Sequence, residues 1–65
     1  MEKDWVRIYS TQSEPDAVLI KQHLENNGIE AITINKQDSL YKAFGEIEVY
    51  VLRLKVIKAK RLLEI

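Results

Sequence analysis

The stretch SEPDAVLIKQHLENNGI, residues 13–29, constrains the fold most because it carries its own helix start and stop signals. Ser13 is a favourable N-cap, and Pro15 is tolerated in the first turn. Glu14 and Asp16 place negative charge at the end where the helix dipole favours it. Gly28 supplies the left-handed residue that commonly ends a helix. The pattern predicts a helix over about residues 14–27.

Apolar and polar residues alternate over residues 5–10, which is typical of a strand with one buried face. Val6 and Ile8 fall on one side of this strand, and Trp5, Arg7 and Tyr9 fall on the other. The first side is expected to be buried against the helix.

Two further β-branched runs, residues 29–35 and 47–52, predict a second and a third strand. In residues 47–52 the polar Glu48 and Tyr50 alternate with apolar neighbours. In residues 29–35 two sets of apolar residues compete, so the buried face and the register of this strand stay open. Beyond residue 52 a helical pattern begins, and a basic helix is expected over about residues 54–64.

This order predicts a single α+β domain, residues 1–65, with a ferredoxin-like βαββα fold. A right-handed crossover that leaves room for the third strand gives a three-stranded antiparallel sheet in the order 1-3-2. Both helices are expected on one face of the sheet. The fourth strand of a complete ferredoxin-like fold is missing, so the first strand is expected to keep an open edge and the sheet to keep one uncovered face.

The composition of the chain argues against metal sites, catalytic groups and membrane spans. The chain has no cysteine and a single histidine, His23, so no metal site, catalytic group or cofactor is predicted. No apolar run approaches the roughly 18 residues that a membrane span needs. The charged start of the chain, MEKDW, is unlike a signal peptide, so a cytoplasmic protein is expected.

The charges of the chain cancel in total but are unevenly distributed. Residues 1–52 hold five Lys and Arg against nine Asp and Glu, whereas residues 53–65 hold five basic residues against one acidic residue. A neutral total argues against nucleic acid as the main partner. The basic tail alone is typical of a solvated helix face.

Several segments together resemble a known family. The run AVLIKQHLENNGIEAITIN, a link that contains SLYKAFG, the strand IEVYV and the closing KAKRLL are similar to the prokaryotic family described as "putative signal-transducing proteins". The resemblance extends from about Ile8 to Leu63 and implies a fold related to the ferredoxin-like PII regulators. It implies no established activity or ligand. Where family members enter the last helix through a proline and acidic residues, this chain has Leu52-Arg53-Leu54-Lys55, which leaves the start of that helix open.

The uncovered sheet face is the first candidate site. It is expected to carry Trp5, Arg7, Tyr9, Glu48 and Tyr50. Aromatic residues on such a sheet are typical of RNA-binding modules, although the neighbouring glutamates oppose that interpretation. The same aromatics would serve as anchors for self-association, or they would simply cover a small sheet.

The link between the second and third strands, residues 35–45, is the second candidate. In the PII proteins that the fold resembles, the corresponding connection is the signalling loop. Hydrogen-bonding, cationic and aromatic groups gather here: Lys36, Asp38, Ser39, Tyr41, Lys42 and Phe44. Long loops in compact domains are often functional, although apolar members of this loop would also cap the core.

A third surface, formed by Leu54, Ile57 and Ile65 on the outer side of the last helix, would contact a protein or anionic lipid, or stay in solvent.

These observations predict a small non-enzymatic binding or regulatory module, a homo-oligomer (dimer or trimer), that responds to a protein or small-molecule effector. The alternatives are a structural self-association domain without a ligand and an RNA-binding sheet.

Overall fold

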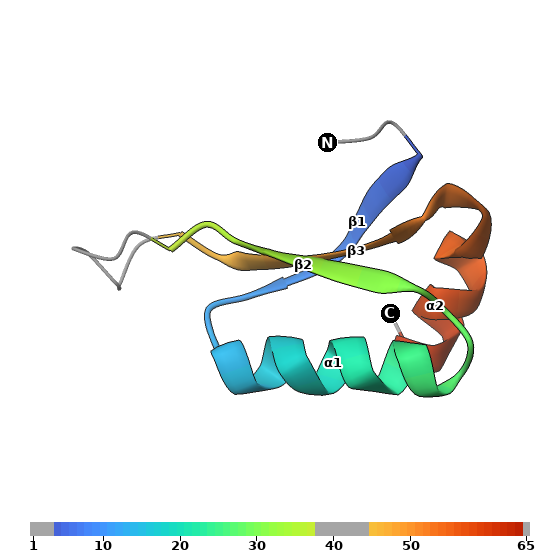
Figure 1. The fold of residues 1–65 in the computed structure, drawn as a ribbon, viewed down its shortest axis with the longest axis horizontal. Helices are drawn as coiled ribbons and strands as arrows, with labels where there is room; N and C mark the ends of the chain where they lie inside the picture. The colour runs from blue at the N-terminus through green and yellow to red at the C-terminus, as the bar shows by residue number, and fades with distance from the viewer. Residues whose placement is uncertain (1–3, 38–44, 65) are drawn as a thin grey trace.

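The computed structural model describes residues 4–37 and 45–64 and confirms the α+β fold. Its elements follow in the order β1 (Trp5–Thr11), α1 (Glu14–Asn26), β2 (Ala31–Asn35), β3 (Ile47–Leu52), a 3-10 turn η1 (Arg53–Lys55) and α2 (Val56–Leu63). The three strands form one antiparallel sheet in the order β1-β3-β2, as the sequence predicted. Figure 1 shows the sheet edge-on, with α1 lying along one face.

Helix α1 is bounded by the residues that predicted it. The Ser13 hydroxyl accepts a bond from the backbone N–H of Asp16. At the other end Gly28 has a φ of 79°, and the Ile29 N–H donates to the Leu24 carbonyl at 3.0 Å. This arrangement is a Schellman motif, in which a residue beyond the helix folds back on the last turn. Leu24 and Ile29 are both fully buried, so the motif also fixes part of the core.

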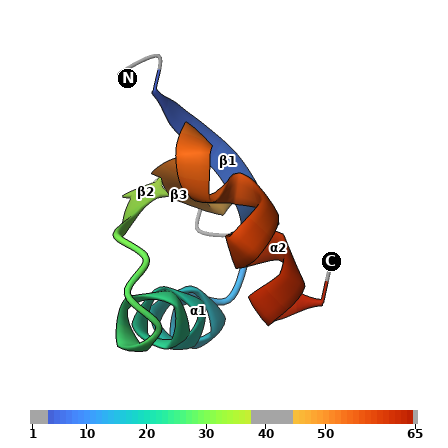
Figure 2. The ribbon, with the colours of Figure 1, turned by 90° about the vertical axis from the view of Figure 1, so that its right-hand side faces the viewer.

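The core lies between the sheet and the helices. Its central members are the two completely buried valines of β3, Val49 and Val51. The other members come from every strand, from both helices and from the turn after α1: Ile8, Ala17, Leu24, Ile29, Ala31, Ile47 and Ala59. Figure 2 shows α2 running from the end of β3 alongside β1 toward α1. Both helices therefore pack on the same side of the sheet.

Two boundaries differ from the predicted ones. The last helix begins at Val56 rather than near residue 54, because Leu52-Arg53-Leu54-Lys55 leads from β3 into the turn η1. No side chain caps the start of either η1 or α2. Strand β2 begins at Ala31, since residues 27–29 are used by the C-terminal motif of α1.

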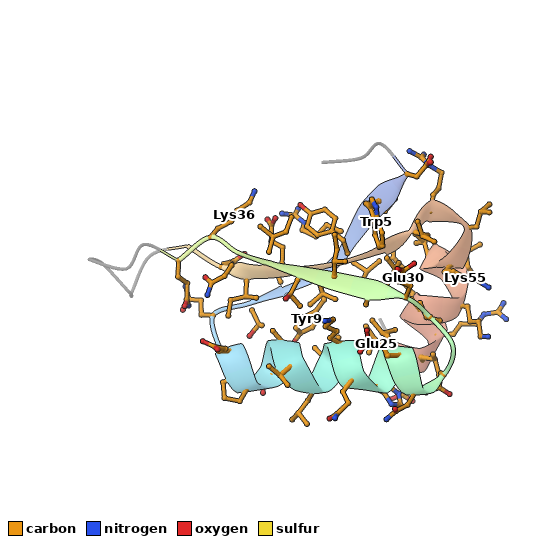
Figure 3. The ribbon with its side chains drawn as sticks, in the orientation of Figure 1. Trp5, Tyr9, Glu25, Glu30, Lys36 and Lys55 are labelled. Carbon is orange, nitrogen blue, oxygen red and sulfur yellow. The ribbon has the colours of Figure 1, made fainter. Side chains whose placement is uncertain are left out.

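Strand β1 contains a β-bulge that the alternating sequence pattern did not reveal. Arg7 lies opposite Tyr50, but the next paired residue is Tyr9, opposite Val49, so Ile8 is an extra residue in the ladder. A bulge brings two consecutive side chains toward the same face. Ile8 is buried in the core and Tyr9 packs against it. Figure 3 shows Tyr9 between the sheet and α1.

Candidate functional site

The face of the sheet opposite the helices is bare among the residues that the structure describes. Cross-strand neighbours in an antiparallel sheet share a face, so the register assigns the members of this surface. We call it the open face, and it comprises Trp5, Arg7, Ser10, Ile32, Ile34, Glu48, Tyr50 and Leu52.

Four of the five residues predicted for this surface are on it, and one is not. Trp5 and Arg7 on β1 lie opposite Leu52 and Tyr50 of β3. Figure 3 shows Trp5 on the side of the sheet away from α1. The prediction for Tyr9 is wrong, because the bulge at Ile8 turns it toward the core.

Glu48 is the central residue of the open face and is almost completely buried. Its side chain is only 8% exposed, although no helix covers this side of the sheet. It lies in the middle strand, and its carboxylate is surrounded by groups from β1, from β3 and from the residue that follows β2. Arg7 Nη1 lies 2.9 Å from Oε2, Lys36 Nζ lies 3.3 Å from Oε1, and the Tyr50 hydroxyl donates to Oε1 at 2.7 Å. We call Glu48 and these three partners the Glu48 cluster.

The electrostatics of the Glu48 cluster fix its protonation state at neutral pH. The hydrogen bond from Tyr50, together with those from Arg7 and Lys36, lowers the pKa of Glu48 from 4.5 to about 2, although burial opposes the shift. The same bond raises the pKa of the Tyr50 hydroxyl, because ionisation would place two negative groups in contact. Glu48 is therefore an anion, and Tyr50 stays a neutral donor.

Acid stability is expected to depend on this carboxylate. Because its pKa is lower in the folded than in the unfolded chain, its contribution to stability is complete above about pH 4.5 and is lost as the pH falls toward about 2. The variant Glu48→Gln keeps the shape of the side chain but does not titrate. We expect urea denaturation between pH 6 and 2 to show a smaller loss of unfolding free energy in Glu48→Gln than in the parent. If the unfolding free energies of the two proteins fell in parallel with pH, the result would contradict the Glu48 cluster.

The second predicted site is only partly described. Asp38, Ser39, Tyr41, Lys42 and Phe44 lie outside the described residues. Lys36 is described, and its backbone N–H donates to the Glu46 carbonyl at 3.0 Å while its ammonium reaches Glu48. The start of the loop is thus joined to the open face.

Sequence reasoning missed several contributors to the open face. It placed Lys36 in the loop and did not pair it with Glu48, and it left out Ile32 and Ile34 because the register of β2 was undetermined. Leu52 was detectable, because it continues the alternation of Glu48 and Tyr50 along β3.

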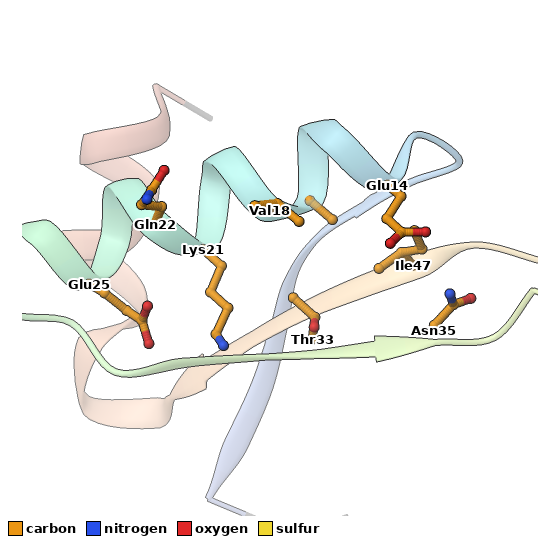
Figure 4. A pocket seen from close by; sticks show the side chains of 9 residues that line it. Glu14, Val18, Lys21, Gln22, Glu25, Thr33, Asn35 and Ile47 are labelled. Atoms are coloured by element: carbon orange, nitrogen blue, oxygen red, sulfur yellow. The ribbon is translucent and has the colours of Figure 1, made fainter.

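A groove lies between α1 and β2, on the helical side of the sheet (Figure 4). Lys21 and Glu25 extend into it from α1, and Thr33 and Asn35 extend from β2. Its remaining lining is Glu14, Ala17, Val18, Gln22 and Ile47. The groove walls carry charges of both signs, and most of their polar side chains are exposed to solvent. The groove is therefore open and does not form an enclosed site.

Several apolar residues outside the strands are also exposed, and two of them were anticipated. Leu54 and Ile57 are 94% and 71% exposed, but Leu54 lies in the turn η1 and only Ile57 lies in the last helix. Ile65 lies outside the described residues. Val18 and Leu19 on α1 are also exposed.

The described part of the chain has neither a cluster of metal ligands nor a membrane-spanning helix. No group of three or more metal-ligating side chains occurs within residues 4–37 and 45–64. None of the helices in those same ranges has the length and hydropathy to cross a membrane.

Comparison with known protein families matches residues 5–65 to the family described as "putative prokaryotic signal transducing protein". No curated protein and no solved structure matches this chain. The family match spans all the strands and helices of the fold and agrees with the resemblance seen in the sequence. The chain therefore belongs to this family.

Proposed function

We propose that this protein is a non-enzymatic regulatory module that binds a partner protein through the open face of its sheet. The observation that carries the proposal is the Glu48 cluster, a buried and fully bonded carboxylate on a face that no described element covers. Buried polar networks hold their members in one arrangement when every group is satisfied. The cluster thereby provides a rigid, preformed surface, and the signal-transducing description of the family supports a regulatory role.

The balance of charge on this face favours a protein over a nucleic acid. Among the described residues, the cations at the centre of this face are Arg7 and Lys36, and both contact Glu48. The negative charge of Glu46 also acts on Arg7. Phosphate binding depends on unneutralised Lys and Arg, which attract the backbone and release its counterions. A balanced face with aromatic and aliphatic neighbours is better suited to the apolar centre and polar rim of a protein interface.

An apolar corner of the open face provides the anchor. Trp5 pairs with Leu52 where β1 begins and β3 ends. Leu54, two residues further along the chain in η1, is 94% exposed. A shallow hollow in this corner is lined by Asp4, Leu52, Arg53 and Leu54. Tryptophan is among the residues that most often dominate binding energy at interfaces.

The chemistry of Glu48 supports a binding role rather than a catalytic one. A general acid or base is effective when its pKa lies near the working pH and its oxygens can reach a substrate. The pKa of Glu48 is about 2, and both of its oxygens already accept bonds from protein groups. Its role in the proposal is to hold Arg7, Lys36 and Tyr50 in place.

The loop 35–45 supplies the regulatory step of the proposal. Lys36 belongs to this loop and to the Glu48 cluster at the same time. An effector or partner that repositions the loop would therefore change the ion pair at the centre of the open face. No bond is made or broken in such a step.

Site-specific photo-crosslinking tests the proposal. A photoreactive phenylalanine analogue replaces Trp5 on the open face, and a matched variant carries it at Gln22, which is exposed on α1. In the native cells we expect a discrete heavier product from position 5 and none of the same mass from position 22. Adding Leu54→Asp should remove the product by disrupting the apolar corner.

Equal products from both positions, or none from position 5, would contradict a protein partner on the open face. A thermal-shift panel of nucleotides and metabolites separates the remaining alternative, since a bound effector raises the melting temperature. A rise that disappears in Trp5→Ala, with no crosslinked product, would assign the face to a small molecule instead.

A further inference from the structure

The outer edge of β2 is available for pairing with another strand. Among the described residues β2 pairs only with β3. Exposed edges are usually protected by charges, proline or a bulge. The sequence of β2, AITIN, has neither charge nor proline, and its register with β3 is regular. The other edge strand, β1, differs because the bulge at Ile8 disrupts it.

The hydrogen bonds between β2 and β3 determine which residues are directed outward. Lys36 donates to the Glu46 carbonyl, so its backbone groups are directed toward β3. Directions alternate along an antiparallel strand. Ile32 and Ile34 are therefore directed inward like Lys36, and the backbone groups of Ala31, Thr33 and Asn35 are directed outward. The side chains of Thr33 and Asn35 are exposed and line the groove between α1 and β2.

We propose that the partner of this edge is a second copy of the chain, with the two β2 strands antiparallel and Thr33 facing Thr33 across a two-fold axis. In this register Ala31 faces Asn35 of the second copy, so every outward N–H and C=O of both strands finds a partner. Ile32 then lies beside Ile34 of the second copy on the open face, an apolar cross-strand pair. Registers shifted by two residues lose part of these bonds.

Charge complementarity selects the second copy and this register. Glu30 and Lys36 lie at opposite ends of β2 (Figure 3). With Thr33 on the axis, Glu30 of each copy faces Lys36 of the other, which gives two ion pairs related by symmetry. Lys36 would then lie between its own Glu48 and the glutamate of the second copy. Shifting the register by two residues in either direction separates Glu30 from Lys36.

The dimer forms a six-stranded sheet in the order β1-β3-β2-β2-β3-β1. The two open faces become one continuous surface, and the helices of both copies remain on the opposite side. This inference is independent of the proposed partner protein, because the apolar corner at Trp5 lies at the far end of the sheet, on β1.

Disulfide trapping tests the register directly, because the chain has no cysteine of its own. Hydrogen-bonded antiparallel residues have Cα atoms about 5.5 Å apart, within the range of about 4.4–6.8 Å that a disulfide accepts. We expect Thr33→Cys to form a covalent dimer under mild oxidation. The matched variant Asn35→Cys should stay monomeric on a denaturing gel, since its Cα atoms would be roughly 14 Å apart.

Sedimentation of the uncrosslinked protein provides the second measurement. The parent should show a species of twice the 7.6 kDa chain mass at high concentration. Glu30→Lys brings two lysines together at each end of the paired strands, so we expect at least tenfold weaker association. Glu64→Lys makes the same charge change at the end of α2 and should leave association unaltered.

A parent that stays monomeric, or equal trapping of Thr33→Cys and Asn35→Cys, would overturn the dimer. Neither result would affect the photo-crosslinking from position 5, so failures of the two proposals are distinguishable.

Discussion

Replacing Leu24 with alanine is expected to leave most of the protein unfolded at 25 °C. Leu24 is completely buried, and its carbonyl accepts the bond that folds Ile29 back on α1. Truncation of a buried leucine costs about 2–5 kcal/mol. Domains of this length without disulfides or metals rarely have more than about 3–5 kcal/mol of stability. This single substitution is therefore expected to remove most of the unfolding free energy of the protein.

Leu19→Ala is the matched control for this prediction. It makes the same chemical change in the same helix, but Leu19 is 62% exposed. We expect its unfolding free energy to stay within about 0.5 kcal/mol of the parent value. Urea denaturation followed by circular dichroism compares the two variants. Similar losses at both positions would mean that the inner face of α1 has been assigned wrongly.

Gly45→Ala is expected to be the second most damaging of the substitutions considered. Gly45 has a φ of 84°, a conformation that costs other residues about 1–2 kcal/mol. An added Cβ would also lie 2.9 Å from the Lys36 carbonyl carbon and would overlap the carbonyl oxygen. Relief of that overlap must move Lys36 and Gln37 away from Gly45, beside the hydrogen bond from Lys36 to Glu46. Overpacking of this kind adds about 1–3 kcal/mol.

Gly28→Ala separates the two contributions. Gly28 has a similar φ of 79°, but an added Cβ would meet no atom within 4 Å. This variant should show the conformational cost alone, whereas Gly45→Ala should show that cost and the steric cost together. Thermal denaturation of both variants gives the difference. Equal destabilisation would show that Gly45 is not in close contact with Lys36.

Local signals made most of the fold predictable from the sequence. Ser13 and Gly28 determine the ends of α1 through contacts within a few residues, so the predicted helix and the observed one nearly coincide. The strand order then follows from crossover handedness and from the room needed for β3. Both inferences depend on chain connectivity rather than on details of packing.

The position of Tyr9 could not be obtained in the same way. An alternating pattern assumes one residue per step of the ladder, and the bulge adds Ile8 as an extra step. Nothing in the composition of β1 marks the bulge, because the residue involved is a bulky isoleucine rather than glycine. The shift becomes visible only when β1 is aligned against β3.

The Glu48 cluster could not be predicted from the sequence for a related reason. Glu48 appeared to be an ordinary exposed position of an alternating strand, yet its side chain is 8% exposed. Its partner Arg7 is 41 residues away in sequence, and Lys36 directly follows the other edge strand, β2. Only the complete register of the sheet brings these groups together. The proximity of Tyr50, two residues along the same strand, was the one part that the sequence showed.

A rigid open face requires that Arg7, Lys36 and Tyr50 hold the Glu48 carboxylate as an anion in solution. Titration of its carboxyl carbon by nuclear magnetic resonance measures this property at a single atom. We predict a titration midpoint at the pKa of about 2 in the parent. In Arg7→Gln the midpoint should be higher, because one of the groups that lower the pKa of Glu48 is absent. A midpoint near the ordinary value of 4.5 in the parent would show that the cluster does not form, and the rigid open face would lose its support.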